Sequence, residues 1–453
     1  MADAGLATPE GRAALVARAL GRLDTDRIAD LVEAMTAVPS PTGGERPLAE
    51  LVAAHLAAAG VAAMVEPVAG NSATSANAVG RIGAGRTGPS ILVYAPLDTA
   101  FAGDREEDLP FLGPEPRADF AFPPLRDGHT IVGLGAENPK GFAAAGIAAV
   151  EALAPEAAAL GGEIVLGLVG GSMPVGARAA LGGGAPLGHG AGIASLLEAD
   201  MPDAAIILKP GWCATHEEVG YAWFRLTVRG AVGYTGIRHK APYRNPALAV
   251  ARLATGLEAW FVDYSARWTD GLVAPQGSVN AVHAGSANRA SFIPATATLD
   301  LDLRISPRAT PELVEAELRD AVTSLAADMP EVEISLDRIA AVPGSGTDPE
   351  HWLVRAVVGA WEALEGRPHE APRRASGASD IGVVRARGIP AVRVGLPPSA
   401  TPNPYPGFSM GVADAGAVRR LAELLVAVLV DLMSRSRGEL GLGDRYPRER
   451  GHV

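Results

Sequence analysis

Residues 91–100 read ILVYAPLDTA, an apolar run of strand length with one carboxylate, Asp98, near its end. Buried parallel strands are continuous apolar runs, and the sites of α/β proteins lie at the carboxyl ends of such strands. Further apolar runs, at residues 162–170 and 204–208, alternate with stretches in which apolar residues recur at helical spacing. This alternation predicts an α/β fold with a doubly wound mixed sheet, and it makes Asp98 a candidate site residue.

A second stretch presents polar side chains after a strand-like segment. Residues 130–141 read TIVGLGAENPKG, where glycines and a proline end the segment and present Glu137, Asn138 and Lys140 ahead of an Ala-rich helix over residues 142–153. Asn138 can both donate and accept hydrogen bonds, which suits contact with an oxyanion or an amide, although asparagine is equally common as a turn residue. Glu137 and Asp98 are the carboxylates in these stretches that could carry a proton.

Composition narrows the class of protein. A chain of 453 residues suggests two or three domains, and 48% hydrophobic with 20% charged residues is a globular composition. The formal net charge of -12 disfavours nucleic acid and anionic membranes as partners, because phosphate groups are bound by clustered Lys and Arg. The single cysteine, Cys213, cannot form an internal disulfide, and the first residues lack the pattern of a signal peptide. We therefore expect a soluble, cytoplasmic protein.

Three stretches together resemble the zinc-dependent amidohydrolase and exopeptidase family that includes acetylornithine deacetylase, succinyl-diaminopimelate desuccinylase and glutamate carboxypeptidase. They are VPSPTGGERPLAELV at residues 38–52, PLD at residues 96–98 and GLGAENPKG at residues 133–141. The family has His-x-Asp at the second of these and Gly-x-Gly-x-x-Asp-x-Lys-Gly at the third. In this chain Pro96 replaces the histidine and Asn138 replaces the metal-bridging aspartate.

The resemblance implies a two-domain organisation. Residues 1–218 and 341–433 would form the catalytic-type α/β domain, and residues 219–340 an inserted α+β lid and dimerisation domain with a long helix over residues 246–259. A homodimer through the lid would follow. The polar, Arg-rich residues 434–453 are expected to form a strap or a disordered end.

The metal ligands that the resemblance implies are missing. Zinc needs three or four His, Cys or carboxylate ligands, and a paired site normally shares a bridging carboxylate. Besides Pro96 and Asn138, the remaining ligand positions are occupied by Gly171 or Ser172, by Lys209, and by the histidine-free stretch TPNPYPGFS at residues 401–409. We therefore expect neither a metal ion nor another cofactor.

Other groups stand where the metal would be held. Lys209, directly after the apolar run 204–208, would place positive charge at the same strand ends, unless it turns to solvent or only neutralises Asp98. Lys140 is less informative, because the metal-bearing relatives also have lysine there. Tyr234 replaces a histidine that in the family reaches across the dimer, and its hydroxyl could polarise a substrate carbonyl.

The resemblance also implies residues that bind a substrate carboxylate. In the lid, the guanidinium of Arg304 matches a carboxylate, unless it pairs with Asp300 or Asp302, and Asn245 matches the family's asparagine before the lid helix. The Gly-rich stretch over residues 173–187 is expected to be a mobile loop over the site. The further binding candidates lie in stretches that follow the family pattern or flank this loop: Asp380, His189 and Ser172.

These positions favour an enzyme that handles a small amino-acid- or peptide-like carboxylate without a metal ion. Losing zinc and its base removes the usual means of activating water, so acyl transfer, cyclisation and elimination stand beside hydrolysis. Two alternatives remain open. One is a catalytically silent paralogue that binds such a ligand. The other is an amidohydrolase with a relocated metal site using His129, His189, His216 or Glu137, whose spacing matches no metal motif.

Overall fold

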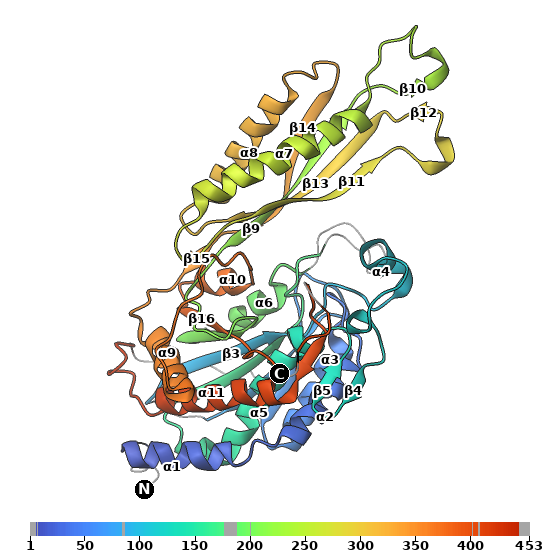
Figure 1. Cartoon of the computed structure of the whole chain (residues 1–453). Helices are drawn as coiled ribbons and strands as arrows, with labels where there is room; N and C mark the ends of the chain where they lie inside the picture. The colour runs from blue at the N-terminus through green and yellow to red at the C-terminus, as the bar shows by residue number, and fades with distance from the viewer. Residues whose placement is uncertain are drawn as a thin grey trace. The chain divides into compact units, whose positions relative to one another are not determined.

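The structure of the chain is a computed structural model, and it describes residue 6 and residues 8–83, 87–175, 188–199, 201–400, 402–405 and 408–443. The chain divides into two compact units (Figure 1). The first unit is built from the described parts of Met1–His216, Thr347–Ala371 and Val383–Val453. The second consists of Glu217–Gly346 and Pro372–Gly382.

A six-stranded mixed sheet organises the first unit. Its strands are, in spatial order, β1 (Ala62–Pro67), β2 (Ala76–Ile82), β6 (Glu163–Val169), β3 (Ser90–Pro96), β7 (Ala204–Leu208) and β16 (Ala391–Val394). β6, β3, β7 and β16 run parallel, whereas β2 is antiparallel to both of its neighbours. Every residue of β3 and β7 is buried, which is why both strands read as unbroken apolar runs.

Helices cover both faces of this sheet. Gly146 of α5 (Phe142–Leu153) lies against Val93, whereas Leu196 of α6 (Ala191–Ala199) lies on the face of Leu92. Successive strand residues point to opposite faces, so α5 and α6 are on opposite sides and the predicted α/β fold is confirmed. The other helices with segments in this unit are α1 (Pro9–Leu20), α2 (Thr25–Thr36), α3 (Arg46–Ala58), α4 (Arg105–Leu112), α9 (Trp352–Glu365), α10 (Ile381–Arg385) and α11 (Ala415–Met433).

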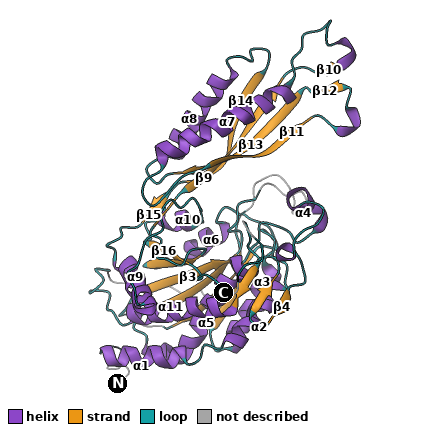
Figure 2. Cartoon of the chain, viewed as in Figure 1, coloured by secondary structure: helices purple, strands orange, loops and turns teal. Residues whose placement is uncertain are grey.

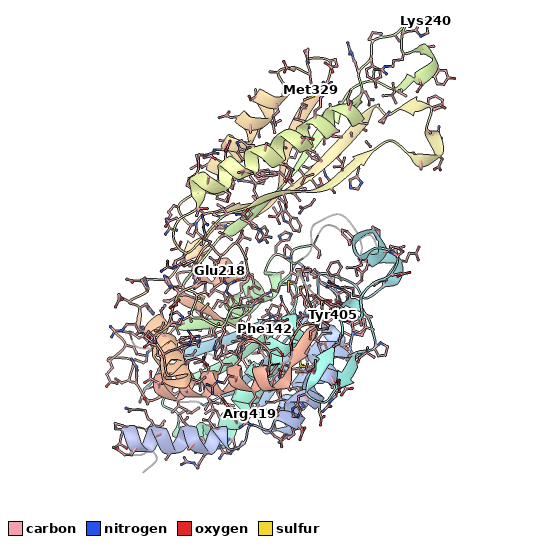
Figure 3. The ribbon with its side chains drawn as sticks, in the orientation of Figure 1. Phe142, Glu218, Lys240, Met329, Tyr405 and Arg419 are labelled. Carbon is pink, nitrogen blue, oxygen red and sulfur yellow. The ribbon has the colours of Figure 1, made fainter. Side chains whose placement is uncertain are left out.

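α5 is the central helix of the first unit. By length and composition alone, the segment 136–159 could cross a membrane. All α5 residues except Glu151 are buried, however, and the helix packs against α11; Phe142 at its start lies in the interior (Figure 3). Its apolar character is therefore that of a core helix.

The stretch 130–141 does not belong to the central sheet. Its first three residues form β5 (Thr130–Val132), which pairs with β4 (Leu125–Asp127) and β17 (Val412–Asp414) in a separate antiparallel sheet. Gly133 ends the strand, and a wide helical turn over Ala136–Gly141 leads into α5. The polar residues of this stretch are therefore carried by a turn that the small sheet supports.

The second unit is an antiparallel sheet with two helices packed against it (Figure 2). The sheet order is β11 (Gly277–Ala284), β13 (Thr296–Ile305), β9 (Gly220–Arg229) and β14 (Glu333–Val342). α7 (Pro246–Trp268) and α8 (Pro311–Ala326) bury their apolar residues on it. Two short pairings complete the unit: β10 (Gly233–Tyr234) with β12 (Phe292–Ile293), and β8 (Glu217–Glu218) with β15 (Ser345–Gly346).

α7 is longer than the predicted helix over residues 246–259. Phe261 and Tyr264 continue the helical spacing of buried residues beyond Leu257. The Tyr264 hydroxyl also donates a hydrogen bond of 2.6 Å to the Arg304 carbonyl oxygen. These aromatic contacts with the sheet extend the helix to Trp268.

The chain after α11 is tied to the start of β3. Arg437 donates two hydrogen bonds to Asp203, at 2.6 and 2.9 Å, and the two side chains are only 12% and 16% exposed. Asp203 also accepts a hydrogen bond of 2.7 Å from the Ser90 N–H. Residues 434–443 thus form a strap on the first unit, and the rest of the predicted tail, residues 444–453, lies outside the described residues.

Arg437→Met should lower the free energy of unfolding by about 2–4 kcal/mol, because it leaves the Asp203 carboxylate buried without its cation. Urea titration at neutral pH measures this difference. Arg435→Met is the matched control: its ion pair with Asp431 is 38% exposed on both sides, so its loss should change stability by no more than about 0.5 kcal/mol. Equal effects of the two substitutions would show that the Arg437–Asp203 pair contributes no more to stability than an exposed ion pair does.

Candidate active site

The carboxyl ends of β3 and β7 bring Asp98 and Lys209 together. The two strands pair in parallel with Tyr94 opposite Ile207, and Asp98 and Lys209 follow shortly after the strand ends. Asp98 is fully buried and Lys209 is 6% exposed. Burial raises the pKa of the Asp98 carboxyl, while its hydrogen bonds and the positive charge of Lys209 oppose that rise. The strand ends therefore hold a buried carboxylate and a buried cation.

Three donors hold the Asp98 carboxylate. The Thr42 hydroxyl donates to Oδ2 at 2.9 Å, the Met173 N–H donates to the same oxygen at 2.8 Å, and the Ser172 N–H donates to Oδ1 at 3.1 Å. Ser172 and Met173 follow the end of β6, the other neighbour of β3. The segment after β6 and the turn before α3 thus converge on the carboxylate at the end of β3, and their donors favour its ionised form.

Lys209 is one of three lysines in the chain, with Lys140 and Lys240. Its Nζ lies 3.7 Å from Met173 Sδ, so the ammonium lies beside the segment that also holds Asp98. A lysine buried to this extent needs compensating charge or function, because desolvation disfavours its ammonium form. Asp98 supplies part of that compensation.

Glu45 is a second buried carboxylate beside Asp98, and the sequence analysis did not identify it. Its Oε1 accepts hydrogen bonds from the N–H groups of Gly43, at 2.6 Å, and Gly171, at 2.9 Å. Burial and then the negative charge of Asp98 raise the pKa of Glu45 to about 7. The signal was present: an acidic residue directly before a helix, after two glycines. Such a residue is ordinarily interpreted as a cap, but Glu45 makes no capping bond to α3.

Glu137 and Asn138 are anchored by Met410. The Met410 carbonyl oxygen accepts hydrogen bonds from both N–H groups, at 3.1 and 3.0 Å, and the Asn138 amide nitrogen lies 3.7 Å from Met410 Sδ. Asn138 Oδ1 is buried and receives no hydrogen bond from the described residues. Burial alone raises the pKa of Glu137 to about 7. The turn therefore holds a buried acceptor with no donor from the described chain and a carboxyl that titrates near neutrality.

Lys140 is turned into the protein. Its Nζ donates a hydrogen bond of 2.9 Å to the Val38 carbonyl oxygen and lies 5.5 Å from the centroid of the Phe122 ring. The side chain is fully buried, and burial lowers its pKa to about 7. These contacts favour the scaffold role that the sequence also allowed, and a role for Lys140 in the chemistry stays a prediction.

The glycines around His189 bring that residue toward the end of β6. His189 has a left-handed backbone (φ 56°), and the Gly190 N–H donates to the Gly171 carbonyl oxygen at 3.0 Å. Burial lowers the pKa of His189, which favours the neutral ring. Of the predicted mobile loop over residues 173–187, residues 176–187 lie outside the described residues.

The four candidates of the second unit have local partners there. Arg304 lies 3.1 Å from Asp302, while Asp300 pairs with Arg225. Asn245 caps α7: its Oδ1 accepts from the Ala247 N–H at 3.0 Å. The exposed Tyr234 has its ring 5.7 Å from that of Phe292, and Asp380 is buried with its negative charge acting on Tyr221. The binding roles of these side chains stay predictions.

The residues around Asp98 do not fit the metal pair that the resemblance implies. Among the described residues, no three His, Cys, Asp or Glu side chains are grouped as a metal site. At the strand ends the carboxylates of Asp98 and Glu45 are accompanied by the ammonium of Lys209, which would repel a metal cation. His129, a candidate for a relocated site, instead pairs with Asp26 at an exposed position, 2.8 Å away.

Known proteins share this architecture. Residues 216–330 match the model of the M20 peptidase dimerisation domain. Human carnosine dipeptidase 1 superposes with a TM-score of 0.70 at 14% identity, covering 92% of this chain and 99% of its own. The dipeptidase Dug1p of Saccharomyces cerevisiae superposes with a TM-score of 0.68 at 13% identity, covering 93% of this chain and 99% of its own. An M20 family metallo-carboxypeptidase of Sulfolobus solfataricus superposes with a TM-score of 0.65 at 14% identity, covering 91% of this chain and 100% of its own. At these identities the likeness establishes the fold, including the inserted lid domain.

Glu45→Gln should change how stability depends on pH. Because the pKa of Glu45 is raised from 4.5 to about 7, the folded protein binds this proton more tightly than the unfolded chain does. The stability that protonated Glu45 contributes is therefore fully present below about pH 4.5 and is lost as the pH rises through about 7. Between those values, the free energy of unfolding of the wild type should fall on the order of 2–3 kcal/mol more than that of Glu45→Gln.

Urea unfolding at pH 4.5, 6 and 7.5 measures this difference. Glu50→Gln, at an exposed position of α3, the helix that begins directly after Glu45, serves as the control and should follow the wild-type profile. Parallel profiles for the wild type and Glu45→Gln would show that the buried carboxylate does not titrate as described.

Proposed function

We propose that this chain, which has the fold of the M20 peptidases and carries their dimerisation domain, is an enzyme that acts without a metal ion on a small amino-acid- or peptide-like carboxylate. The observation that carries the proposal is the buried pair of Lys209 and Asp98 at the ends of β7 and β3. The fold's solved neighbours, named as dipeptidases and a carboxypeptidase, support a peptide-like substrate.

Lys209 supplies the electrostatic stabilisation in this proposal. A fixed ammonium in a water-poor site stabilises negative charge that develops on a substrate oxygen in the transition state. Asp98, held by three donors, keeps the lysine charged and oriented. The pair thus provides charge where a metal ion would otherwise act as a Lewis acid.

Glu137 is the proposed proton carrier. A carboxyl with a pKa of about 7 exists in both protonation states at neutral pH, which is the condition for general acid–base catalysis. Next to it, the buried Asn138 Oδ1 offers an acceptor for a substrate N–H or O–H. This arrangement supports chemistry at an amide or acyl group. It is compatible with acyl transfer, cyclisation or elimination as well as with hydrolysis.

Substrate binding and assembly complete the proposal. The Ser172 N–H donates to Asp98 and the Gly190 N–H next to His189 donates to Gly171, so Ser172 and His189 are proposed as substrate contacts. Arg304, Asn245 and Asp380 are the side chains proposed to bind the substrate carboxylate and its neighbouring groups. We further propose a homodimer through residues 219–340, to which Tyr234 would contribute its hydroxyl, and a cytoplasmic location. The match to the dimerisation domain supports the first, and the single Cys213 is consistent with the second.

Lys209→Met should reduce turnover by about two orders of magnitude or more, because it keeps most of the side chain's packing and removes the charge. A screen of N-acyl amino acids and dipeptides provides the substrate, and kcat is compared between variants. Lys240→Met, the same substitution at an exposed position of the second unit, should retain wild-type kcat. A protein that binds these compounds without turning any of them over would be the silent paralogue. Near-normal turnover by Lys209→Met would refute the role of the ammonium.

Turnover should not depend on a metal ion. We expect that dialysis against EDTA leaves kcat unchanged and that added Zn²⁺, Mn²⁺ or Co²⁺ does not raise it. Elemental analysis of the purified protein, run beside the activity measurements, should find less than stoichiometric metal. One or two tightly held ions per chain, with activity lost on their removal, would instead establish the amidohydrolase with a relocated metal site.

A further inference from the structure

Four phenylalanines of the first unit form a continuous row, which we call the aromatic shelf: Phe111, Phe101, Phe120 and Phe408. Ring centroids of successive members are 6.3, 5.2 and 6.2 Å apart; the first two contacts are edge-to-face and the third is stacked. These are favourable geometries for aromatic pairs. The chain has nine phenylalanines in all, so the shelf gathers nearly half of them.

The two ends of the aromatic shelf are open to solvent. Phe111 is 78% exposed and Phe408 is 64% exposed, whereas Phe120 between them is buried. Exposed rings that belong to one packed aromatic row differ from single exposed apolar residues, and such a row is typical of a surface that binds a ligand. The buried ring fixes the row in place, and the exposed rings remain available for contact.

The aromatic shelf is carried by segments that also carry the candidate active site. Phe101 lies three residues after Asp98, and Phe408 lies two residues before Met410, whose carbonyl oxygen holds Glu137 and Asn138. Ser409 lies between Phe408 and Met410 in the chain, and its hydroxyl donates a hydrogen bond of 2.9 Å to Asp119, the residue next to Phe120. The segments that carry the proposed chemistry therefore also carry the shelf.

Arg117 is in direct contact with these rings, and it is already paired. Arg117 donates two hydrogen bonds to the buried Asp119, at 2.9 and 2.8 Å, and a third of 2.7 Å to the Phe408 carbonyl oxygen. Its guanidinium also lies against the rings of Phe120 and Tyr405, at 5.2 and 4.9 Å from their centroids; Tyr405 is labelled in Figure 3. The charge of Arg117 is therefore compensated by Asp119, and the rings themselves supply an aromatic, uncharged contact surface.

We propose that the aromatic shelf is a substrate subsite and that the substrate of this protein carries an aryl group beside its amide or acyl group. This inference rests on the proposed function, since it names the chemical class of the carboxylate that the enzyme takes. The aryl ring would lie against Phe408, the exposed end of the shelf two residues before Met410, while the reacting group reaches Glu137 and Asn138. Ring stacking at low conformational cost provides the selectivity.

Two matched pairs of probes test this subsite by binding alone. N-acetyl-L-phenylalanine is compared with N-acetyl-L-alanine, and N-benzoylglycine with N-acetylglycine, by calorimetric titration of the full-length protein. We expect the aryl member of at least one pair to bind about tenfold more tightly than its partner. Phe408→Ala should abolish that preference and Phe111→Ala, at the far end of the row, should reduce it less, with the affinity for the alkyl member unchanged in both. Both rings are exposed, so their truncation leaves the core intact.

Met64→Ala, at an exposed position of β1, an edge strand of the central sheet that carries none of the shelf rings, is the control and should keep the preference. Absence of aryl preference in both pairs, or a preference that survives Phe408→Ala, would overturn the inference. Light scattering of the same variants tests whether the shelf instead binds another protein chain. A change in molecular mass without a change in affinity for the aryl compounds would make the shelf a protein-docking surface. These tests measure affinity and not turnover. If the protein binds aryl compounds preferentially but turns none of them over, the subsite is supported and the proposed enzymatic function is refuted.

Discussion

The burial of the Asp98 carboxylate is the constraint on which the site depends. A carboxylate at the end of a fully buried strand loses its hydration, and the protein must replace it. Thr42, Ser172 and Met173 do so with three hydrogen bonds, and Lys209 does so with charge. These groups come from three segments, so holding one carboxylate also fixes the turn before α3 and the ends of β6 and β7.

Burial also explains why two further carboxyls, those of Glu45 and Glu137, have pKa values near neutrality. Glu45 shares the interior with Asp98, and two adjacent carboxylates cannot both ionise freely there, so its pKa rises to about 7. Glu137 reaches a similar pKa by burial alone, without a charged partner. A site with one fixed ammonium and two carboxyls that exchange protons near pH 7 has the means for acid–base chemistry without a metal ion.

Two features connect this chemistry to recognition. The small sheet of β4, β5 and β17 holds the turn of Glu137 and Asn138 through the Met410 carbonyl, and the residues just before Met410 carry one end of the aromatic shelf. A substrate group held on the shelf would therefore be positioned relative to the proton carrier by the same short segment. In the second unit, Asn245 and Arg304 already serve the structure as a helix cap and an ion-pair partner.

The sequence by itself determined the sheet, the placement of Asp98 and Lys209 at strand ends, and the inserted lid. Apolar runs and helical spacing are local patterns, and they survive in residues 90–96, 142–153 and 204–208 with nearly the predicted bounds. Only the tertiary structure decided which side chains meet. Glu45 comes to Asp98 from 53 residues away, Lys140 turns to the Val38 carbonyl, and Phe408 stacks on Phe120 across nearly 300 residues. Such contacts are set by how whole elements pack, and no local periodicity encodes them.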